Sequence, residues 1–372
     1  MIVLMLSRED SLCKEGWGYA RAFERRGDTL VCVEPGTPLN VDIETLLKKC
    51  PSRPDLILHP ETDFPYLPEG LTEVDIPTAC FHIDTFKYLN QRLRWSGLFD
   101  FPLLFHPNLE NEFRRAGHAG ARTNLHAAQI DFYGRAAVAQ DERGYEVGWV
   151  GQVGGALYQA RARILPELAR EFRMNDWKRR YTLAETAELY RHSKIVVNVG
   201  RDDYPQDANM RVFEVMAAGT LLITRMPSEL TSAGFVEGEH FVGYSDESEI
   251  VGLVRRYLKD DSGREKIAGA GRELVLGEHT YDHHVAGLMN AIAQPGGSRL
   301  AAARRWPETR TRLTRLEYFA GECHLDCAYR EFQWLARHSP GKTLQGASLL
   351  GRAWMRRSLN RRRMLQAAAA RS

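Results

Sequence analysis

Short, continuously apolar runs alternate with amphipathic stretches over the first 130 residues, and this alternation constrains the fold most. Such runs are typical of parallel strands that are buried on both faces of a sheet. The expected strands are Met1–Leu6, Thr29–Val33, Asp55–Leu58, Thr78–Ile83 and Pro102–His106. The expected helices between them are Gly18–Arg26, Asp42–Lys49 and Asn111–Ala116. Because alternating strands and helices form right-handed βαβ units, we expect a doubly wound α/β domain.

The alternation restarts near residue 140, which predicts a second domain of the same kind. Its expected strands are Glu146–Val150, Lys194–Val199, Leu221–Thr224 and His240–Tyr244. Its expected helices are Ala160–Phe172, Thr182–His192, Met210–Ala218, Glu247–Lys259 and Arg264–Leu276. Thr182, with Glu185 three residues later, has the spacing of a capping box. We predict Rossmann-like domains at residues 1–140 and 141–294, followed by a linker at 295–298 (Pro-Gly-Gly-Ser).

A basic, helical extension is expected at residues 299–372. The whole chain has a formal net charge of +2, but this segment contains 16 Lys and Arg against 5 Asp and Glu. It indicates an anionic partner, such as a membrane surface, although a solvated Arg-rich helical end explains it equally well. Nucleic acid is not expected, because the rest of the chain is acidic and lacks a nucleic-acid-binding motif. Apolar residues predict packed helices here: Trp334, Leu335, Leu349, Leu350, Trp354 and Met355.

The first residues of the chain and its cysteines indicate the cellular compartment of the protein. Met1–Leu6 is followed at once by charged residues rather than by a cleavage site, so we expect a cytoplasmic protein. Peripheral binding to the inner face of the membrane is an alternative location. No apolar run is long enough to cross a bilayer. The six cysteines are scattered, which favours reduced thiols over a disulfide framework. Cys323 and Cys327 are one helical turn apart, and a core-facing pair is favoured over metal or redox use.

The segment Asp207–Gly219 carries the most chemical information. Asn209 is a good N-cap, and Gly219 is the residue expected just past a helix end. The helix N-terminus and Arg211 in its first turn can bind an anion. Glu214 lies among apolar residues, where a carboxylate needs a hydrogen-bond donor. The segment therefore predicts a phosphate site next to a hydroxyl acceptor, or alternatively an ion pair between Glu214 and a distant arginine.

Residues 209–219, followed by Thr-Leu-Leu-Ile-Thr, resemble the nucleotide-binding signature of family 4-like GT-B glycosyltransferases, closest to the spore-maturation (CgeB-like) branch. Further segments match this family in order and spacing: Val147–Gly151, Leu189–Asn198, Glu237–His240, Ala270–Arg272 and His279–Tyr281. The resemblance covers about residues 1–292. It implies the GT-B fold, in which two doubly wound domains face a cleft.

The activity implied by the resemblance is transfer of a sugar from a nucleoside diphosphate sugar to a hydroxyl acceptor. The donor is the co-substrate, with a uridine nucleotide favoured, and the acceptor is a glycan, a lipid-linked glycan or a protein. Anomeric configuration would be retained. No cofactor and no metal is expected, because cations and helix dipoles stabilise the leaving diphosphate in such enzymes. The acidic pairs Asp202-Asp203 and Asp260-Asp261 are therefore not taken as metal ligands.

The resemblance also assigns donor-binding roles. Glu214 is expected to bind the donor ribose, and the amides of Met210 and Arg211, behind the Asn209 cap, are expected to face the diphosphate. Arg211 would stabilise the leaving group as a catalytic residue. The loop at Gly151 is expected near the phosphates, because glycine allows close backbone approach.

The sequence does not decide which residues make two of the contacts in this expected donor site. The basic residue beside the phosphates is Arg161 or, as a second choice, Arg163, and a solvated helix face is the alternative for either. The family commonly carries E-x7-E, but eight residues before Glu214 the chain has Gln206. Gln206 or the neighbouring Asp207 would contact the sugar, or this stretch is a surface loop without that contact.

The N-terminal domain is expected to hold the acceptor. Gly16 and Gly18 follow the first strand and would form a glycine loop toward the donor phosphates, unless they are ordinary turn residues. Asp84 follows a buried strand, where α/β folds place ligands, and is the candidate to polarise the acceptor hydroxyl. A helix N-cap is the alternative for Asp84. His126 is a second catalytic candidate, against a capping or packing role.

Two other classes of protein were compared with this prediction. A non-catalytic GT-B protein that binds a glycan or a partner is favoured by the missing first Glu of E-x7-E. A doubly wound oxidoreductase is disfavoured, because Gly151–Gly155 lacks the spacing of the dinucleotide fingerprint. No P-loop, G-x-S-x-G or H-E-x-x-H motif occurs.

Overall fold

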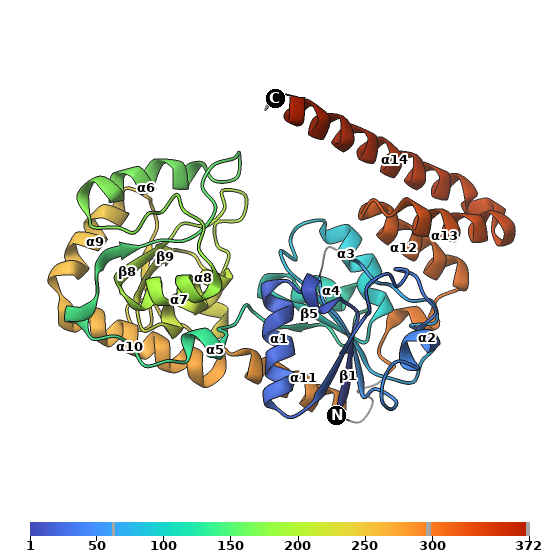
Figure 1. Ribbon diagram of the computed structural model, residues 1–372, viewed down its shortest axis with the longest axis horizontal. Helices are drawn as coiled ribbons and strands as arrows, with labels where there is room; N and C mark the ends of the chain where they lie inside the picture. Colours follow the sequence, from blue (N-terminus) through green and yellow to red (C-terminus); the bar gives the residue numbers. More distant parts are fainter. Residues whose placement is uncertain (62–63, 295–298, 370–372) are drawn as a thin grey trace. The chain divides into compact units, whose positions relative to one another are not determined.

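The computed structural model describes residues 1–61, 64–294 and 299–369 (Figure 1). The chain forms two compact units. Unit 1 comprises Met1–Phe105, Leu109–Thr123 and Leu288–Ser372, and unit 2 comprises His106–Asn108 and Asn124–Gly287. Each unit is built on one parallel sheet, so the predicted pair of α/β folds is confirmed.

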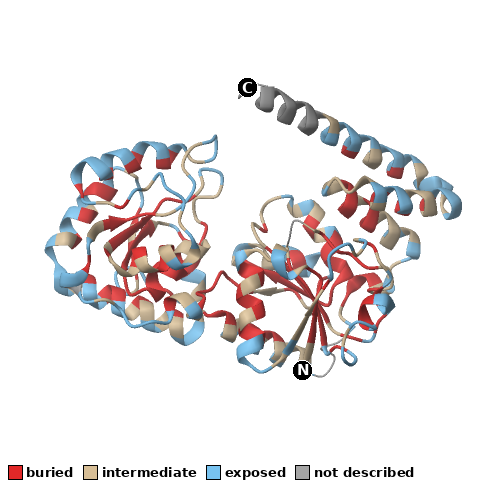
Figure 2. Cartoon of the chain, in the orientation of Figure 1, coloured by how far each residue is buried: buried red, intermediate tan, exposed pale blue. Residues whose placement is uncertain are grey.

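The sheet of unit 1 has six parallel strands in the order β2-β1-β3-β4-β5-β6. They are β1 (Ile2–Met5), β2 (Thr29–Cys32), β3 (Leu56–His59), β4 (Thr78–His82), β5 (Phe101–Leu104) and β6 (Arg122–Thr123). The five predicted strands are confirmed, and β3, β4 and β5 are buried along their whole length (Figure 2). The sequence pattern misses β6, because its two residues form no apolar run.

Four helices connect these strands: α1 (Lys14–Arg25), α2 (Ile43–Leu47), α3 (Leu89–Trp95) and α4 (Glu110–Arg115). Helix α1 begins earlier than predicted, because the Cys13 Sγ caps the Gly16 amide. Gly16 and Gly18 therefore lie inside α1, and the prediction of a glycine loop at these positions is wrong. The helix start packs tightly, since a Cβ atom on Gly16 would lie 3.1 Å from Leu12 Cδ2.

The sheet of unit 2 has four parallel strands in the order β10-β9-β8-β7. These are β7 (Tyr145–Gly148), β8 (Ser193–Asn198), β9 (Leu221–Arg225) and β10 (Val242–Tyr244). The helices are α5 (Ile130–Tyr133), α6 (Gln159–Glu171), α7 (Leu183–Arg191), α8 (Met210–Ala217), α9 (Glu249–Lys259), α10 (Asp261–Glu278) and α11 (Tyr281–Ala293). All predicted elements of this unit are present, and the capping box of Thr182 and Glu185 is confirmed.

Residues 124–140 lie in unit 2, not before a boundary near residue 140 as the sequence pattern indicates. The side chain of Arg272 on α10 explains this, because it donates hydrogen bonds to the carbonyls of Tyr133, Gly134 and Arg135. Residues 106–108 also join unit 2, because His106 contacts Glu229.

The C-terminal segment forms α12 (Glu308–Gly321), α13 (Leu325–His338) and α14 (Pro340–Ala369). It is not a separate extension, because its apolar residues complete the core of unit 1. Leu316, Phe319, Leu335 and Ala353 are buried in the same cluster as Leu4 and Ile57 of the sheet. Trp334, Leu349 and Leu350 also pack there as predicted, whereas Trp354 and Met355 are exposed. The linker expected at 295–298 lies outside the described residues.

The C-terminal helices are also held by a buried ion pair. Arg315 of α12 donates from Nε to Glu331 Oε1 of α13 at 2.6 Å, and both side chains are buried. The two other guanidinium nitrogens of Arg315 donate to the carbonyls of Leu67 and Pro68. One arginine therefore joins α12, α13 and the loop after β3.

The six cysteines are free thiols, as expected, and Cys327 packs against the core of unit 1. Within the part of the chain that the structure describes, none of the helices has the length and apolar character needed to span a bilayer.

Candidate functional site

The first turn of α8 has the predicted caps. Asn209 has an extended backbone and its Oδ1 accepts the Arg211 amide at 3.1 Å. Gly219 has a φ of +71°, the left-handed conformation that ends a helix. The Arg211 amide is thus occupied by the cap. The Met210 amide donates no such hydrogen bond among the described residues and stays available to a ligand.

The side chain of Arg211 crosses from α8 to the ends of two strands. Its Nε and Nη2 donate to the Val150 carbonyl at 3.0 and 2.7 Å, just after β7. Its Nη1 donates to Asn198 Oδ1 at 2.7 Å, at the end of β8. These contacts fix the guanidinium at the carboxyl edge of the sheet, where open α/β sheets bind ligands.

Gly151 is required beside this guanidinium. A Cβ atom at position 151 would collide with Nη2 of Arg211 and lie 3.0 Å from the Trp149 ring. The glycine therefore leaves room for the arginine, and the expected place of the Gly151 loop near the phosphates stays a prediction.

Arg161 on α6 supplies a second cation. It is only 6% exposed, and it donates to the Val199 carbonyl at 2.8 Å and the Gln152 carbonyl at 3.0 Å. Burial and the positive charge of Arg211 lower its pKa to about 9, so it remains charged at neutral pH. Tyr158 stacks under the guanidinium, 4.3 Å from ring centre to Cζ.

Arg161 and Arg211 are held by carbonyl, amide and aromatic groups, and among the described residues neither forms an ion pair with a carboxylate. Two neighbouring cations, one buried and one partly buried, repel each other, and an anion between them would remove that cost. Guanidinium groups bind phosphate oxygens in a fixed geometry. The arrangement is therefore a candidate site for a phosphate or diphosphate.

Arg163 is not part of this site. It is exposed and pairs with Glu247 at 2.8 Å. Residues two apart on a helix point in different directions, so the buried position of Arg161 excludes Arg163 from the same place. Its position agrees with the alternative of a solvated helix face. Asp202, considered above as half of an acidic pair, accepts the amides of Gln159 and Ala160 and thus caps α6.

Glu214 is buried on the inner face of α8, as its apolar neighbours predict. Burial, together with the nearby Glu214 carboxylate, raises the pKa of Tyr133 well above its usual value. The same two causes act on Tyr190, although Arg211 opposes them there. The carboxylate thus lies in a polar cluster beneath the first turn of α8, one turn from Arg211.

The sequence analysis misses a buried cluster in front of α8. His106 Nδ1 lies 2.9 Å from Glu229 Oε2 and 3.9 Å from Asp207 Oδ1. Tyr204 donates to Glu229 Oε1 at 2.7 Å, and the Ala208 amide donates to Oε2 at 3.4 Å. Because His106 and Glu229 are 123 residues apart, no local motif signals the contact.

This cluster contains Asp207, one of the two candidates for the sugar contact. Gln206 is half-buried next to it, and its carbonyl accepts the Glu229 amide at 3.0 Å. His, Asp and Glu are also ligand types for a divalent cation, and the three ligand atoms lie within 4.8 Å of one another. Tyr204 and Ala208 donate hydrogen bonds to Glu229, and His106 Nδ1 lies within hydrogen-bond distance of the same carboxylate.

Unit 1 has a polar pocket of about 620 Å³ at the carboxyl ends of β1, β3 and β4. Asp84 lines it, in a turn with a φ of +48° directly after β4. Asp84 is not a helix cap, because α3 begins after Tyr88, and its Oδ2 lies 3.8 Å from Lys87 Nζ. The pocket thus joins the predicted residue Asp84 to a second carboxylate, Glu61.

Glu61 and the C-terminal helices complete this pocket. Glu61 forms an ion pair with Arg92 at 2.7 Å, and burial raises its pKa despite that arginine. Tyr318, Glu322 and His324 from the α12–α13 region also line the pocket. The sequence analysis assigns no role to these residues, since the resemblance ends before them. His126, the other catalytic candidate, is buried in unit 2 and is not among the residues that line this pocket.

The fold and the anion site define a class of protein. Two parallel-sheet α/β units with a helical C-terminal region correspond to the GT-B glycosyltransferase fold. Residues 137–290, which include α8 and both arginines, match the family model described as glycosyl transferase-like. None of the curated proteins compared with the chain matches it.

Solved structures agree with this class. HepE from Anabaena, in complex with UDP, has a TM-score of 0.53 at 11% identity, covering 78% of this chain and all of its own. A glycosyltransferase from Rickettsia africae gives 0.54 at 8% identity, over 78% and 97% of the two chains. Sucrose-phosphate synthase from Thermosynechococcus elongatus gives 0.53 at 12% identity, over 78% and 98%. At these identities, the likeness concerns the fold alone.

Proposed function

We propose that the protein is a glycosyltransferase that transfers a sugar from a nucleoside diphosphate sugar to a hydroxyl acceptor. The observation that carries this proposal is the pair of neighbouring arginines, Arg161 and Arg211, fixed by backbone carbonyls near the N-terminus of α8. As the glycosidic bond breaks, negative charge develops on the leaving diphosphate. Fixed cations placed there stabilise the transition state more than the ground state and so accelerate the reaction.

The finer features of the proposed reaction follow the family resemblance. We expect retention of anomeric configuration and no requirement for a metal, since two arginines and a helix N-terminus can balance the diphosphate charge. A uridine nucleotide is the favoured base, and the UDP bound in the HepE structure supports this choice. We also propose that the chain is closest to the spore-maturation (CgeB-like) branch, on the resemblance of residues 209–219 and the following Thr-Leu-Leu-Ile-Thr.

The acceptor would bind in the pocket of unit 1. Its carboxylates, Asp84 and Glu61, can accept a proton or a hydrogen bond from the acceptor hydroxyl. We propose a glycan, a lipid-linked glycan or a protein as acceptor, and Asp84 as the residue that polarises its hydroxyl. In unit 2, Gln206 or Asp207 would contact the transferred sugar.

A panel of nucleotide sugars tests the proposed function. The purified chain should be stabilised thermally by UDP or another nucleoside diphosphate, because a ligand that binds the folded state raises the unfolding temperature. It should also hydrolyse or transfer one of the corresponding sugars in the presence of EDTA. Nucleotide binding without turnover across the panel would favour the alternative, a non-catalytic GT-B protein that binds a glycan or a partner.

Replacing Glu214 should weaken nucleotide binding through the ribose. For Glu214→Gln we expect about a tenfold rise in the Kd of UDP, because a hydrogen bond to a charged group contributes about 1.5 kcal/mol. Inorganic pyrophosphate has no ribose, so its Kd should not change. Isothermal titration calorimetry measures both. An equal loss of affinity for both ligands, or no loss for UDP, would contradict the ribose role.

We also propose that α14 binds an anionic membrane surface, which would place the protein at the cytoplasmic face of a membrane. One face of α14 packs on unit 1, but Leu344, Trp354 and Met355 are 85%, 63% and 54% exposed. Arg352 and Arg356 are exposed on the same helix. Apolar side chains flanked by arginines suit the interface of a bilayer that contains acidic lipids.

Vesicle sedimentation tests this contact. The protein should bind phosphatidylglycerol vesicles but not phosphatidylcholine vesicles, and Arg352→Gln should weaken binding about fivefold, since each arginine contributes about 1 kcal/mol. Trp354→Ser should also release the protein. Tyr329→Ser, which removes an exposed aromatic residue from α13, is the matched control and should leave binding unchanged. Equal binding to both kinds of vesicle, or to neither, would refute the proposal.

A further inference from the structure

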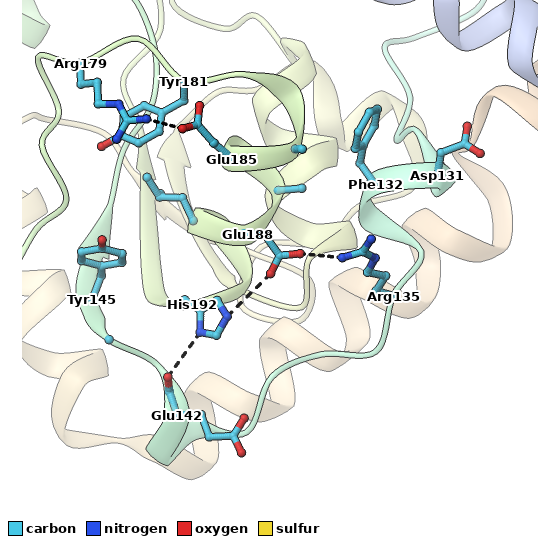
Figure 3. A pocket seen from close by; sticks show the side chains of 14 residues that line it. Asp131, Phe132, Arg135, Glu142, Tyr145, Arg179, Tyr181, Glu185, Glu188 and His192 are labelled. Carbon is cyan, nitrogen blue, oxygen red and sulfur yellow. Dashed lines mark hydrogen bonds and ion pairs between the residues drawn. The ribbon is translucent and has the colours of Figure 1, made fainter.

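Unit 2 contains a cavity of about 860 Å³ that the proposed transfer does not use (Figure 3). Its walls come from α5, from the start of β7 and from α7 with the loop before it. Tyr145 is the first residue of β7, and His192 directly precedes β8, so the cavity lies at the amino ends of these strands. Arg211 contacts residues at the carboxyl ends of the same strands. The cavity is therefore separate from the anion site.

Aromatic and small side chains shape the interior. Phe132, Tyr145 and Tyr181 are half-buried, so part of each ring is presented to the cavity. Ala184 and Ala187 on α7 leave space between these rings because their side chains are short. A concave site of this size with aromatic walls is typical of a small-molecule site.

Pairs of opposite charges surround the rings. Arg179 pairs with Glu185, and Arg135 pairs with Glu188 at 2.9 Å (Figure 3). His192 Nε2 lies 3.7 Å from the same Glu188 carboxylate. Each pair presents hydrogen-bond donors and acceptors side by side. A sugar hydroxyl is both donor and acceptor, so neighbouring hydroxyls of a saccharide can bind across such a pair.

The charge of the lining excludes a phosphorylated ligand. Four carboxylates line the cavity, and they outnumber two arginines and one histidine. The carboxylates are those of Asp131, Glu142, Glu185 and Glu188. The lining therefore stays net negative even with His192 protonated, and would repel a nucleotide or a sugar phosphate. Aromatic walls, paired charges and negative potential together favour a neutral polyhydroxylated ligand.

From this geometry, we propose that the cavity binds a neutral oligosaccharide. The apolar C–H faces of sugar rings pack on Phe132, Tyr145 or Tyr181, and the hydroxyls bind the charged pairs. The volume accommodates more than one sugar ring. The site is independent of the proposed transfer reaction, because it needs neither the donor nor the two arginines.

The test uses the full chain and three neutral probes: cellotetraose, maltotetraose and chitotetraose. Saturation-transfer NMR and calorimetry measure binding to the wild type and to Ala184→Trp, which fills the cavity from an exposed position on α7. Ala169→Trp is the matched control, since Ala169 is exposed on α6 and does not line the cavity. UDP affinity, measured in parallel, reports whether unit 2 stays folded.

We expect at least one probe to bind, with a Kd raised at least about tenfold by Ala184→Trp and unchanged by Ala169→Trp. UDP should bind all three proteins alike. The proposal is overturned if none of the probes binds the wild type. It is equally overturned if Ala184→Trp binds the probe as well as the wild type does, or if glucose 6-phosphate displaces the bound probe more effectively than glucose.

Discussion

Arg211→Ala and Arg161→Ala should each lower kcat/KM for sugar transfer by about 100-fold, or about 2.7 kcal/mol of transition-state stabilisation. Each removes one of two fixed cations from the proposed site of the leaving diphosphate. The remaining arginine cannot move to replace the lost charge, because it lies on another helix and hydrogen bonds to backbone carbonyls fix its guanidinium. Steady-state kinetics with the donor identified by the panel measures the effect.

Arg163→Ala is the control for this experiment. It removes an arginine from the same helix as Arg161, but from an exposed position paired with Glu247. Its kcat/KM should stay within about twofold of the wild type, because surface ion pairs contribute little. Arg211→Gln removes the positive charge, whereas glutamine keeps an N–H donor for the Val150 carbonyl. This variant therefore tests the charge rather than the hydrogen bond. Near-normal turnover of a folded Arg211→Gln protein would sink the leaving-group role.

Glu331→Ala should destabilise unit 1 by about 3 kcal/mol, the cost of leaving a buried charge without its partner. Glu331 is 1% exposed, and Arg315 stays tied to the carbonyls of Leu67 and Pro68 when the carboxylate is gone. Hydrogen exchange measures the change locally, which matters because a two-unit chain need not unfold in one step. Amides of α12 and β3 should exchange about 100-fold faster.

The internal reference for this measurement is β8, in the core of unit 2, where exchange should not change. Glu308→Ala is the matched variant, because Glu308 pairs with Arg312 at 3.4 Å on the exposed side of α12. It should cost less than about 0.5 kcal/mol. If Glu331→Ala left α12 protection at the wild-type level, the buried ion pair would not hold the C-terminal helices.

The strands could be predicted from the sequence because burial on both faces leaves continuous apolar runs. This succeeds for β3 and β4, whose residues are all buried. It fails for β6, which has two residues, and for α3, whose seven residues are too few to show a clear helical period. Apolar residues such as Leu335 predicted that the C-terminal helices are packed. The particular contacts of Arg315 with Leu67 and Pro68 could not be predicted, since these residues are more than 200 positions apart.

Some features of the candidate site could likewise be predicted from the sequence, and others could not. The caps of α8 follow from local residue preferences, and Asn209 and Gly219 take the predicted conformations. The choice between Arg161 and Arg163 could not follow from spacing, because only the packing of α6 on the sheet decides which side chain is buried. The contact of His106 with Glu229 has no local signal, and Gly16 and Gly18 were misplaced because the cap at Cys13 starts α1 early.

The order in which the chain visits its two units has a practical consequence for building chimaeras. The chain leaves unit 1 after Thr123 and returns to it at Leu288, within α11. If the part of the chain after a single crossover near residue 140 were exchanged with that of a relative, foreign helices would enter the core of unit 1. Two crossovers, at 123/124 and 287/288, would keep that core intact, while the segment 106–108 would need matching at His106 and Asn108.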